Sequence, residues 1–338
     1  MRAVLIGQTG KPELVEVPLP IVGRGEVVIK MIACGICGTD IEKIKGHYKG
    51  SMPVIGHEAV GSVEEVGDDV SGFRKGIIVV PHHHVECGKC YYCIHGSETM
   101  CPEYRKYNFI PGGFAEFFKL PAWIVSNGGI HVPPRNINPE EATLTEPLAC
   151  CIRALKRVGL KRGINALILG LGPIGLLFIK LLRYYEAESV IGYDLTEYRL
   201  KMAEKAGAKV VHSDNVATEL PYIVDRRGVD LTILATGSMK GLATALDCTR
   251  PGGIVCLFGL PPHNSKLDYD ISRLVNYELS IVTSNAATKK EMDEALKLIS
   301  EGVIKVDDII THRLSLDRFG EALEIYESRD CGKIIITP

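Results

Sequence analysis

Four cysteines in one short segment have the spacing of a metal site. In HHHVECGKCYYCIHGSETMCP, which runs from residue 82 to residue 102, they follow the pattern C-x2-C-x2-C-x7-C. Four thiolates at such spacings hold one tetrahedral zinc ion, and a site closed by four sulfurs has no open position for a substrate. The histidines at positions 82–84 and 95 are not needed as ligands, because four sulfurs are available. We therefore predict a structural zinc bound by Cys87, Cys90, Cys93 and Cys101.

A second group of metal-binding residue types lies upstream. The segment GICGTD contains Cys37, and GHEAVG places His57 next to Glu58. Thiolate, imidazole and carboxylate are ligand types of a zinc site that keeps one position free for catalysis. Each residue alone has an ordinary structural explanation, since a cysteine can be a small buried hydrophobe and a histidine can be hydrogen-bonded in a core. Glu146, in TLTEPLACC, is a further acid in an apolar stretch, where it could instead cap the helix that follows.

A glycine pattern in the middle of the chain is typical of dinucleotide binding. The segment ILGLGPIG has the form G-x-G-x-x-G and contains Gly170, Gly172, Pro173, Ile174 and Gly175. These glycines allow a tight turn, close approach of the backbone to a pyrophosphate, and close packing of the helix on the strand. Asp194 ends the next apolar run, SVIGYD, at about the 20-residue separation expected of an acid that binds the adenine ribose. The pattern and the acid together predict an NAD site.

The elements around these residues fall into two kinds. Up to about residue 145 the chain consists of short β-like runs broken by Gly and Pro, such as VVIKMIACG and FAEFFKLP, which favours a mostly β domain. From about residue 150, apolar β-branched runs alternate with helical stretches, which predicts a parallel sheet covered by helices on both faces. After residue 285, two further helices and a final strand, KIIIT, are expected.

Composition and charge exclude several classes of protein. A chain of 338 residues is too long for one core and suggests two domains. The net charge of −2 and the absence of a basic cluster argue against nucleic-acid and membrane partners. The most apolar stretch, residues 166–182, contains three glycines, a proline and a lysine, so it does not form a membrane span. Eleven cysteines without a signal peptide indicate metal thiolates rather than disulfides, which predicts a cytoplasmic protein.

Together these segments resemble the zinc-containing medium-chain dehydrogenases/reductases, the superfamily of alcohol and polyol dehydrogenases. The resemblance spans nearly the whole chain, from GICGTD and GHEAVG through the four-cysteine lobe, EPLA and GLGPIG to GKIIIT. It implies an α/β fold with a GroES-like, mostly β catalytic domain and a Rossmann domain with a doubly wound parallel sheet. The expected boundaries are 1–148 for the catalytic domain with its zinc lobe, 149–286 for the Rossmann domain and 287–338 for the return to the catalytic domain.

The resemblance also implies roles for single residues. It suggests two zinc ions per chain, with the catalytic ion bound by Cys37, His57 and Glu58, and by Glu146 directly or through water in exchange with Glu58. Thr39 would accept the proton of the substrate hydroxyl, and Asp40 would orient His57. Glu42 stands where many relatives have the outer histidine of a proton relay. Arg199 would cover the adenine of NAD, and His83 falls at a substrate-pocket position.

The EPLA segment is most similar to the sorbitol, threonine and glucose dehydrogenase branch. We therefore expect hydride transfer to NAD from a secondary or hemiacetal hydroxyl of a polyol or sugar, because His83, Glu42 and Glu146 add polar groups near the metal. Alternatives are a simple alcohol dehydrogenase or aldehyde reductase, a threonine-type dehydrogenase, and a catalytically silent nucleotide-binding protein on the same fold. A homo-oligomer, tetramer or dimer, is expected by the same resemblance.

Overall fold

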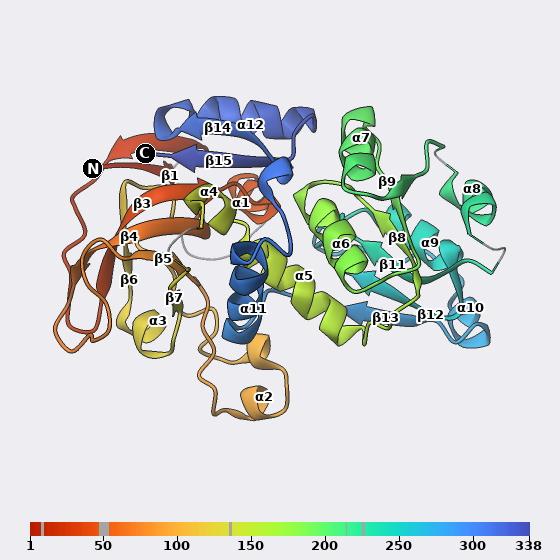
Figure 1. Cartoon of the computed structure of the whole chain (residues 1–338), viewed down its shortest axis with the longest axis horizontal. Helices are drawn as coiled ribbons and strands as arrows, with labels where there is room; N and C mark the ends of the chain where they lie inside the picture. Colours follow the sequence, from red (N-terminus) through yellow and green to blue (C-terminus); the bar gives the residue numbers. More distant parts are fainter. Residues whose placement is uncertain (8–9, 47–53, 135–136, 214, 225–226) are drawn as a thin grey trace. The chain divides into compact units, whose positions relative to one another are not determined.

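The chain divides into two units, and its C-terminal part belongs mostly to the first (Figure 1). The computed structural model describes residues 1–338 except 8–9, 47–53, 135–136, 214 and 225–226. The first unit comprises Met1–Ala149, Ala286–Ser328 and Lys333–Pro338, and the second comprises Cys150–Asn285 and Arg329–Gly332. None of the helices in the described part of the chain combines the length and hydrophobicity that a membrane span requires.

A seven-stranded sheet organises the first unit. Its strands have the order β14-β15-β3-β4-β5-β7, with β6 paired to β3 on the side. The bounds are β3 Val27–Gly35, β4 Glu58–Val66, β5 Ile78–Pro81, β6 Phe117–Leu120, β7 Ile130–His131, β14 Ile310–Ser315 and β15 Lys333–Thr337. A separate antiparallel pair joins β1 Arg2–Ile6 to β2 Pro12–Glu16. Since β15 pairs antiparallel with β3, the C-terminal strand lies beside the end of β3 that precedes the GICGTD segment.

Short helices connect these strands. They are α1 Gly38–Ile44, α2 Tyr91–Ile94, α3 Ala122–Ser126 and α4 Pro139–Ala142, followed by the longer α5 Thr145–Arg157, α11 Lys289–Ser300 and α12 Phe319–Ser328, with single turns η1 Glu98–Met100, η2 Asp307–Ile309 and η3 Leu316–Arg318. A capping box starts α11, because Glu291 accepts the backbone N–H of Thr288 at 3.1 Å. Helix α5 begins in the first unit and continues into the second.

The second unit contains a six-stranded sheet in which every pairing is parallel. Its strand order is β10-β9-β8-β11-β12-β13. The strands are β8 Asn165–Leu169, β9 Ser189–Tyr193, β10 Lys209–Val210, β11 Val229–Leu234, β12 Thr249–Leu257 and β13 Ser280–Thr283. The helices of this unit are α6 Pro173–Tyr184, α7 Glu197–Lys205, α8 Val216–Ile223, α9 Met239–Cys248 and α10 Ile271–Asn276. The strand order reverses at β8, which is where doubly wound sheets bind nucleotides.

Burial explains why the strands of the second unit read as continuous apolar runs. Ala166, Leu167, Ile168 and Leu169 of β8 are all buried, since helices cover both faces of a parallel sheet of this kind. The predicted α/β fold, with a GroES-like domain and a Rossmann-type domain, is confirmed.

Candidate active site

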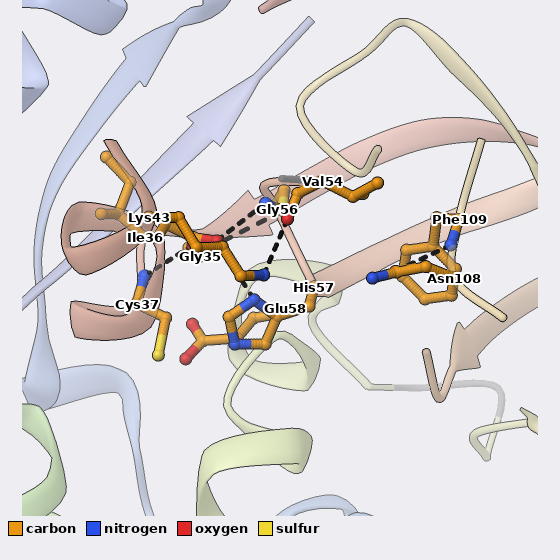
Figure 2. A network of polar contacts seen from close by, with 12 residues as sticks. Gly35, Ile36, Cys37, Lys43, Val54, Gly56, His57, Glu58, Asn108 and Phe109 are labelled. Atoms are coloured by element: carbon orange, nitrogen blue, oxygen red, sulfur yellow. Dashed lines mark hydrogen bonds and ion pairs between the residues drawn. The ribbon is translucent and has the colours of Figure 1, made fainter. Parts of the chain in front are cut away.

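Cys37, His57 and Glu58 form one group in the first unit. One ligand atom from each lies within 4.8 Å of the others, and Figure 2 shows the sulfur, the imidazole ring and the carboxylate turned toward one another. Cys37 occupies the N-cap position of α1, His57 precedes β4, and Glu58 is the first residue of β4. Gly35 is paired with Glu58, and a Cβ at Gly35 would lie 2.2 Å from Glu58 Oε2, so only glycine leaves room for the carboxylate.

Asp40 holds two members of this group in place. Its Oδ2 accepts the backbone N–H of Cys37 at 3.1 Å, and its Oδ1 accepts that of Gly56 at 3.0 Å. His57 Nδ1 lies 3.2 Å from Oδ1, which leaves Nε2 as the ring nitrogen for a metal. Burial by itself would raise the pKa of Asp40, but the charge and hydrogen bond of His57 lower it. The buried carboxylate is therefore ionised, and it holds the backbone of Cys37 and the imidazole of His57 in place.

Lys333 is a member of the site that no sequence pattern indicated. Its ammonium donates to Glu58 Oε2 and, at 3.1 Å, to the carbonyl of Ile36. Glu58 and Lys333 are 1% and 3% exposed, so this is a fully buried ion pair. Burial by itself would lower the pKa of Lys333, but the charge of Glu58 raises it. The residues are 275 positions apart, and only the pairing of β15 with β3 brings them together.

The donor set fits a zinc ion. Sulfur, imidazole nitrogen and carboxylate oxygen are ligands that zinc accepts at a site with an open position. Glu58 Oε1 is buried and has no hydrogen-bond partner among the described residues. A buried carboxylate oxygen without a partner is costly, and a cation beside it removes that cost.

The four cysteines of the lobe also come together. The ligand atoms of Cys87, Cys90, Cys93 and Cys101 lie within 4.8 Å of one another around α2 and η1, and none of these cysteines forms a disulfide. Backbone N–H groups of Lys89 and Cys90 lower the pKa of Cys87 to about 6, which favours its thiolate, whereas burial raises the pKa of Cys93 to about 12 and also raises that of Cys101. Four sulfurs in this arrangement fit a closed tetrahedral zinc site.

The remaining residues predicted near the metal lie on α1 and α5. Thr39 and Glu42 are half-buried on α1, two and five positions after Cys37. Glu146 is buried in the first turn of α5, and its charge acts on Lys333. Glu146 is not among the three residues whose ligand atoms lie within 4.8 Å of one another. Its role as a ligand stays a prediction.

A cluster of imidazoles lies beside His57. The centroid of the His83 ring is 4.8 Å from that of His57 and 3.8 Å from that of His84. Burial holds the pKa of His82 and His83 well below the usual value, so both rings are neutral. His83 Nδ1 and both ring nitrogens of His82 are buried without a hydrogen-bond partner in the described part of the chain. His84 was not predicted as a pocket residue, and burial lowers its pKa to about 3.

The glycine motif of the second unit has the backbone that its pattern requires. Gly170 has a φ of 98°, a value that glycine adopts without strain. A Cβ at Gly175 would lie 2.1 Å from the carbonyl oxygen of Gly170, so the close contact of α6 with the loop needs glycine. Gly172 is the N-cap of α6, followed by Pro173 and Ile174 in its first turn, and the free N–H groups there suit a phosphate.

Asp194 is tied to this loop. Its Oδ2 accepts the backbone N–H of Leu171 at 2.7 Å, and its Oδ1 accepts that of Thr196 at 3.2 Å. Arg199 Nη1 lies 3.6 Å from Asp194 Oδ2, and its guanidinium is 3.7–3.8 Å from the position of a Cβ on Gly172. The acid and the arginine thus form a pair next to the glycine loop, which the sequence did not indicate.

Comparison with known proteins identifies the family. The family descriptions "Alcohol dehydrogenase GroES-like domain" and "Zinc-binding dehydrogenase" match residues 23–129 and 173–301. The chain is 34% identical over 337 residues to the L-threonine 3-dehydrogenase of Pyrococcus furiosus. The aligned region covers 96% of this chain and 94% of that protein. The chain belongs to the zinc-containing medium-chain dehydrogenases/reductases. It is therefore a zinc-containing oxidoreductase, as the sequence predicted.

Two further members of the family show the range of similar proteins. The sorbitol dehydrogenase of Bacillus subtilis is 28% identical, with 100% of this chain and 97% of that protein covered. The structure of a zinc-binding dehydrogenase from Sinorhizobium meliloti, bound to NADP, superposes with a TM-score of 0.87 at 27% identity, covering 100% of this chain and 99% of that one. Zinc and a nicotinamide cofactor are thus supported for this family member.

Proposed function

We propose that this enzyme oxidises a secondary or hemiacetal hydroxyl of a polyol or sugar and transfers the hydride to NAD. The observation that carries the proposal is His83, whose buried Nδ1 has no hydrogen-bond partner in the described structure and whose ring lies beside His57. An alkyl substrate would leave such a buried polar atom unpaired, at a cost of about 1–3 kcal/mol. A further hydroxyl of a polyol substrate would satisfy it.

The proposed roles follow from the contacts around the metal group. Cys37, His57 and Glu58 hold the catalytic zinc, with Glu146 as the further carboxylate. When bound, zinc supplies a positive charge that lowers the pKa of a substrate hydroxyl toward neutrality. Asp40 positions Cys37 and His57 through its hydrogen bonds. Thr39 receives the hydroxyl proton, and Glu42 on the same helix is the outer group to which that proton passes.

The second unit supplies the hydride acceptor in this proposal. The glycine loop and the N-terminus of α6 bind the pyrophosphate, Asp194 accepts hydrogen bonds from the adenine ribose, and Arg199 lies over the adenine. The four cysteines of the lobe hold a second, structural zinc. Its ligands are all sulfur, so the lobe contributes to folding rather than to hydride transfer.

A substrate panel tests the proposal. Reduction of NAD is followed with sorbitol, glucose and 1-butanol, for the wild type and for His83→Phe. We expect the wild type to prefer sorbitol or glucose, and His83→Phe to reduce the ratio of polyol to butanol activity by at least about tenfold, because it removes one hydrogen bond to the substrate. A preference of the wild type for butanol, or an unchanged ratio in the variant, would contradict the proposal.

A threonine-type dehydrogenase is the second candidate. It is favoured by the 34% identity to the L-threonine 3-dehydrogenase of Pyrococcus furiosus, which exceeds the 28% identity to sorbitol dehydrogenase. L-threonine carries a secondary hydroxyl, so the proposed reaction at the metal is the same. L-threonine belongs in the same panel, and a kcat/KM for it above those for sorbitol and glucose would select this candidate.

A further inference from the structure

Lys333 takes up one of the two oxygens of the Glu58 carboxylate. Its ammonium donates to Oε2 and, at 3.1 Å, to the carbonyl of Ile36. The other oxygen, Oε1, is buried without a hydrogen-bond partner among the residues that the structure describes. The two oxygens of this carboxylate therefore differ in their surroundings, because a protein donor holds only one of them.

The backbone around the pair keeps this arrangement in place. Lys333 is the first residue of β15, Glu58 is the first residue of β4, and both strands pair with β3. A Cβ at Gly35 would lie 2.2 Å from Glu58 Oε2 and 3.3 Å from Lys333 Cδ, so glycine is needed where the two side chains meet. Lys333 is 3% exposed, so its ammonium stays with the acceptors that the protein supplies.

The same ammonium lies close to the proposed metal ligands. Burial by itself would lower the pKa of Lys333, but the charges of Glu58, Cys37 and Glu146 raise it. Glu58 and Cys37 are two of the three residues whose ligand atoms lie within 4.8 Å of one another. A positive charge at this place repels a metal cation, so Lys333 does not contribute to metal affinity directly. Its effect on a metal site must come from what it does to Glu58.

We propose that Lys333 is a positioning residue that makes Glu58 a ligand through Oε1 alone and so keeps one position of the catalytic metal free for the substrate. The role rests on the proposed function, in which Cys37, His57 and Glu58 hold a zinc ion. A catalytic zinc site has three protein ligands and one open position. Carboxylates bind metals through one oxygen or through both, and a second oxygen of Glu58 would fill that position. The hydrogen bond from Lys333 to Oε2 prevents this.

The zinc affinity of this ligand group tests the proposal. Full-length protein freed of its catalytic metal is titrated with zinc in competition with a chelator, and Cys37→Ser shows how much zinc the cysteine lobe binds by itself. Lys333→Met frees the second oxygen of Glu58 and removes a charge that repels the metal. We therefore expect Lys333→Met to bind the zinc that depends on Cys37 at least about tenfold more tightly, which corresponds to 1.4 kcal/mol. A lysine that only supports the fold predicts the opposite, because its loss would loosen the ligand group.

Lys43→Met is the matched control. Lys43 is half-buried on α1, the helix that begins after Cys37, and its ammonium donates to the carbonyl of Val54 at 2.7 Å. Its removal takes away a positive charge near the ligands but leaves the hydrogen bond between Lys333 and Glu58 in place. We expect it to tighten zinc binding by less than about threefold, through a partly screened charge effect. Equal tightening in the two variants, or unchanged or weaker binding in Lys333→Met, would overturn the proposal.

Cobalt(II) in place of the catalytic zinc reports on the open position itself. Imidazole that binds at this position changes the visible absorption of cobalt(II), and we expect saturable binding in the wild type. Lys333→Met should need at least about tenfold more imidazole for the same change, because the second oxygen of Glu58 competes for the position. Equal imidazole affinity in the two proteins would contradict the proposed role of Lys333.

A crystal structure of the zinc-loaded wild type tests the proposal even where Lys333→Met does not fold. We expect Glu58 Oε1 at about 2.0–2.2 Å from the zinc and Oε2 still bound to Lys333. Both oxygens on the zinc, or neither, would overturn the role of Lys333 while zinc at Cys37 and His57 still supports the proposed function. A structure with zinc in the cysteine lobe and none at Cys37 and His57 would contradict the proposed function, and the role of Lys333 with it.

Discussion

Asp194 is the residue that should set the preference of the enzyme for NAD over NADP. Backbone N–H groups fix it beside the glycine loop, and a 2′-phosphate would face it with like charge, worth about 4 kcal/mol at about 4 Å near a protein surface. Arg199, 3.6 Å away, offsets part of this repulsion. We expect kcat/KM to be higher for NAD than for NADP. Asp194→Ser should lower the ratio of the two values at least about tenfold, and Arg199→Ala should raise it.

Steady-state kinetics with both cofactors measures these ratios. A wild type that uses NADP more efficiently would show that Arg199, rather than Asp194, dominates the binding of the ribose.

The buried pair of Glu58 and Lys333 should be strongly coupled. Lys333→Met leaves the Glu58 carboxylate buried without its partner, and breaking such a pair costs about 3–5 kcal/mol in the free energy of unfolding. The double variant Glu58→Gln, Lys333→Met should recover most of this loss, because neither charge remains. Urea denaturation measures the free energy of unfolding of both variants. The buffer contains zinc so that the cysteine lobe keeps its metal.

Lys75→Met is the control for this cycle. Lys75 pairs with Glu64, but its side chain is 71% exposed, and exposed pairs contribute only about 0–1 kcal/mol. A similar cost for Lys75→Met and Lys333→Met would show that burial does not strengthen the Glu58–Lys333 pair.

At the scale of elements, the zinc lobe and α1 should respond differently to loss of a thiolate. Cys90→Ser opens the four-sulfur site around α2, so we expect a lower melting temperature, because structural zinc contributes directly to folding. Cys37→Ser, at the N-cap of α1, should abolish turnover with little change in melting temperature. Metal analysis should find two zinc ions per chain in the wild type and one in each variant. A well-folded wild type with one zinc and an empty lobe would refute the two-site assignment.

The amino ends of β8, β11 and β12 should be sensitive to acid. Asp230 joins them by accepting from the backbone of Asn165 and the side chain of Arg250. Burial by itself would raise the pKa of Asp230, but these hydrogen bonds lower it. Since the folded pKa lies below the unfolded value of about 3.9, the stabilisation is present above that pH and is lost as pH falls through the folded pKa. Asp230 is partly exposed, so screening reduces the effect to about 1 kcal/mol.

Asp230→Asn should therefore lower the urea midpoint at neutral pH, and this effect should shrink as the pH falls through the folded pKa, below which wild-type Asp230 is also protonated. An equal loss above and below that pKa would show that packing, not charge, is what the substitution removes.

At the scale of the whole molecule, the edge of the second sheet predicts self-association. β13 is the terminal strand of that sheet, and apolar side chains on it and on the preceding segment are exposed, namely Ile271, Val275, Tyr277 and Ile281. An unpaired strand edge with apolar neighbours is a template for pairing with another chain, and a second copy pairing edge to edge gives a symmetric dimer. Ile281→Lys should shift the protein toward monomer in light scattering after size exclusion, and a wild type that is already monomeric would exclude this interface.

Much of the fold and part of the site follow from local sequence. The segment VVIKMIACG coincides with β3, and the alternation of strands and helices after residue 150 predicts the parallel sheet of the second unit. These predictions hold because apolar spacing and the Gly and Pro breaks act over a few residues. The edge strand β13 was not predicted, because its four residues, Ser280–Thr283, are mostly exposed and too few to show a clear apolar alternation.

By itself, the sequence determined the ligand types, the glycine loop and the family, because each depends on residues close together in the chain or on a pattern along its whole length. Only the tertiary structure decided that Lys333 pairs with Glu58, that Arg199 lies beside Asp194, and that the His83 ring lies next to His57. The first of these contacts joins residues 275 positions apart and depends on the register of β15 against β3. Strand register is set by packing of the whole sheet, and no local pattern specifies which distant side chain it brings to a given carboxylate.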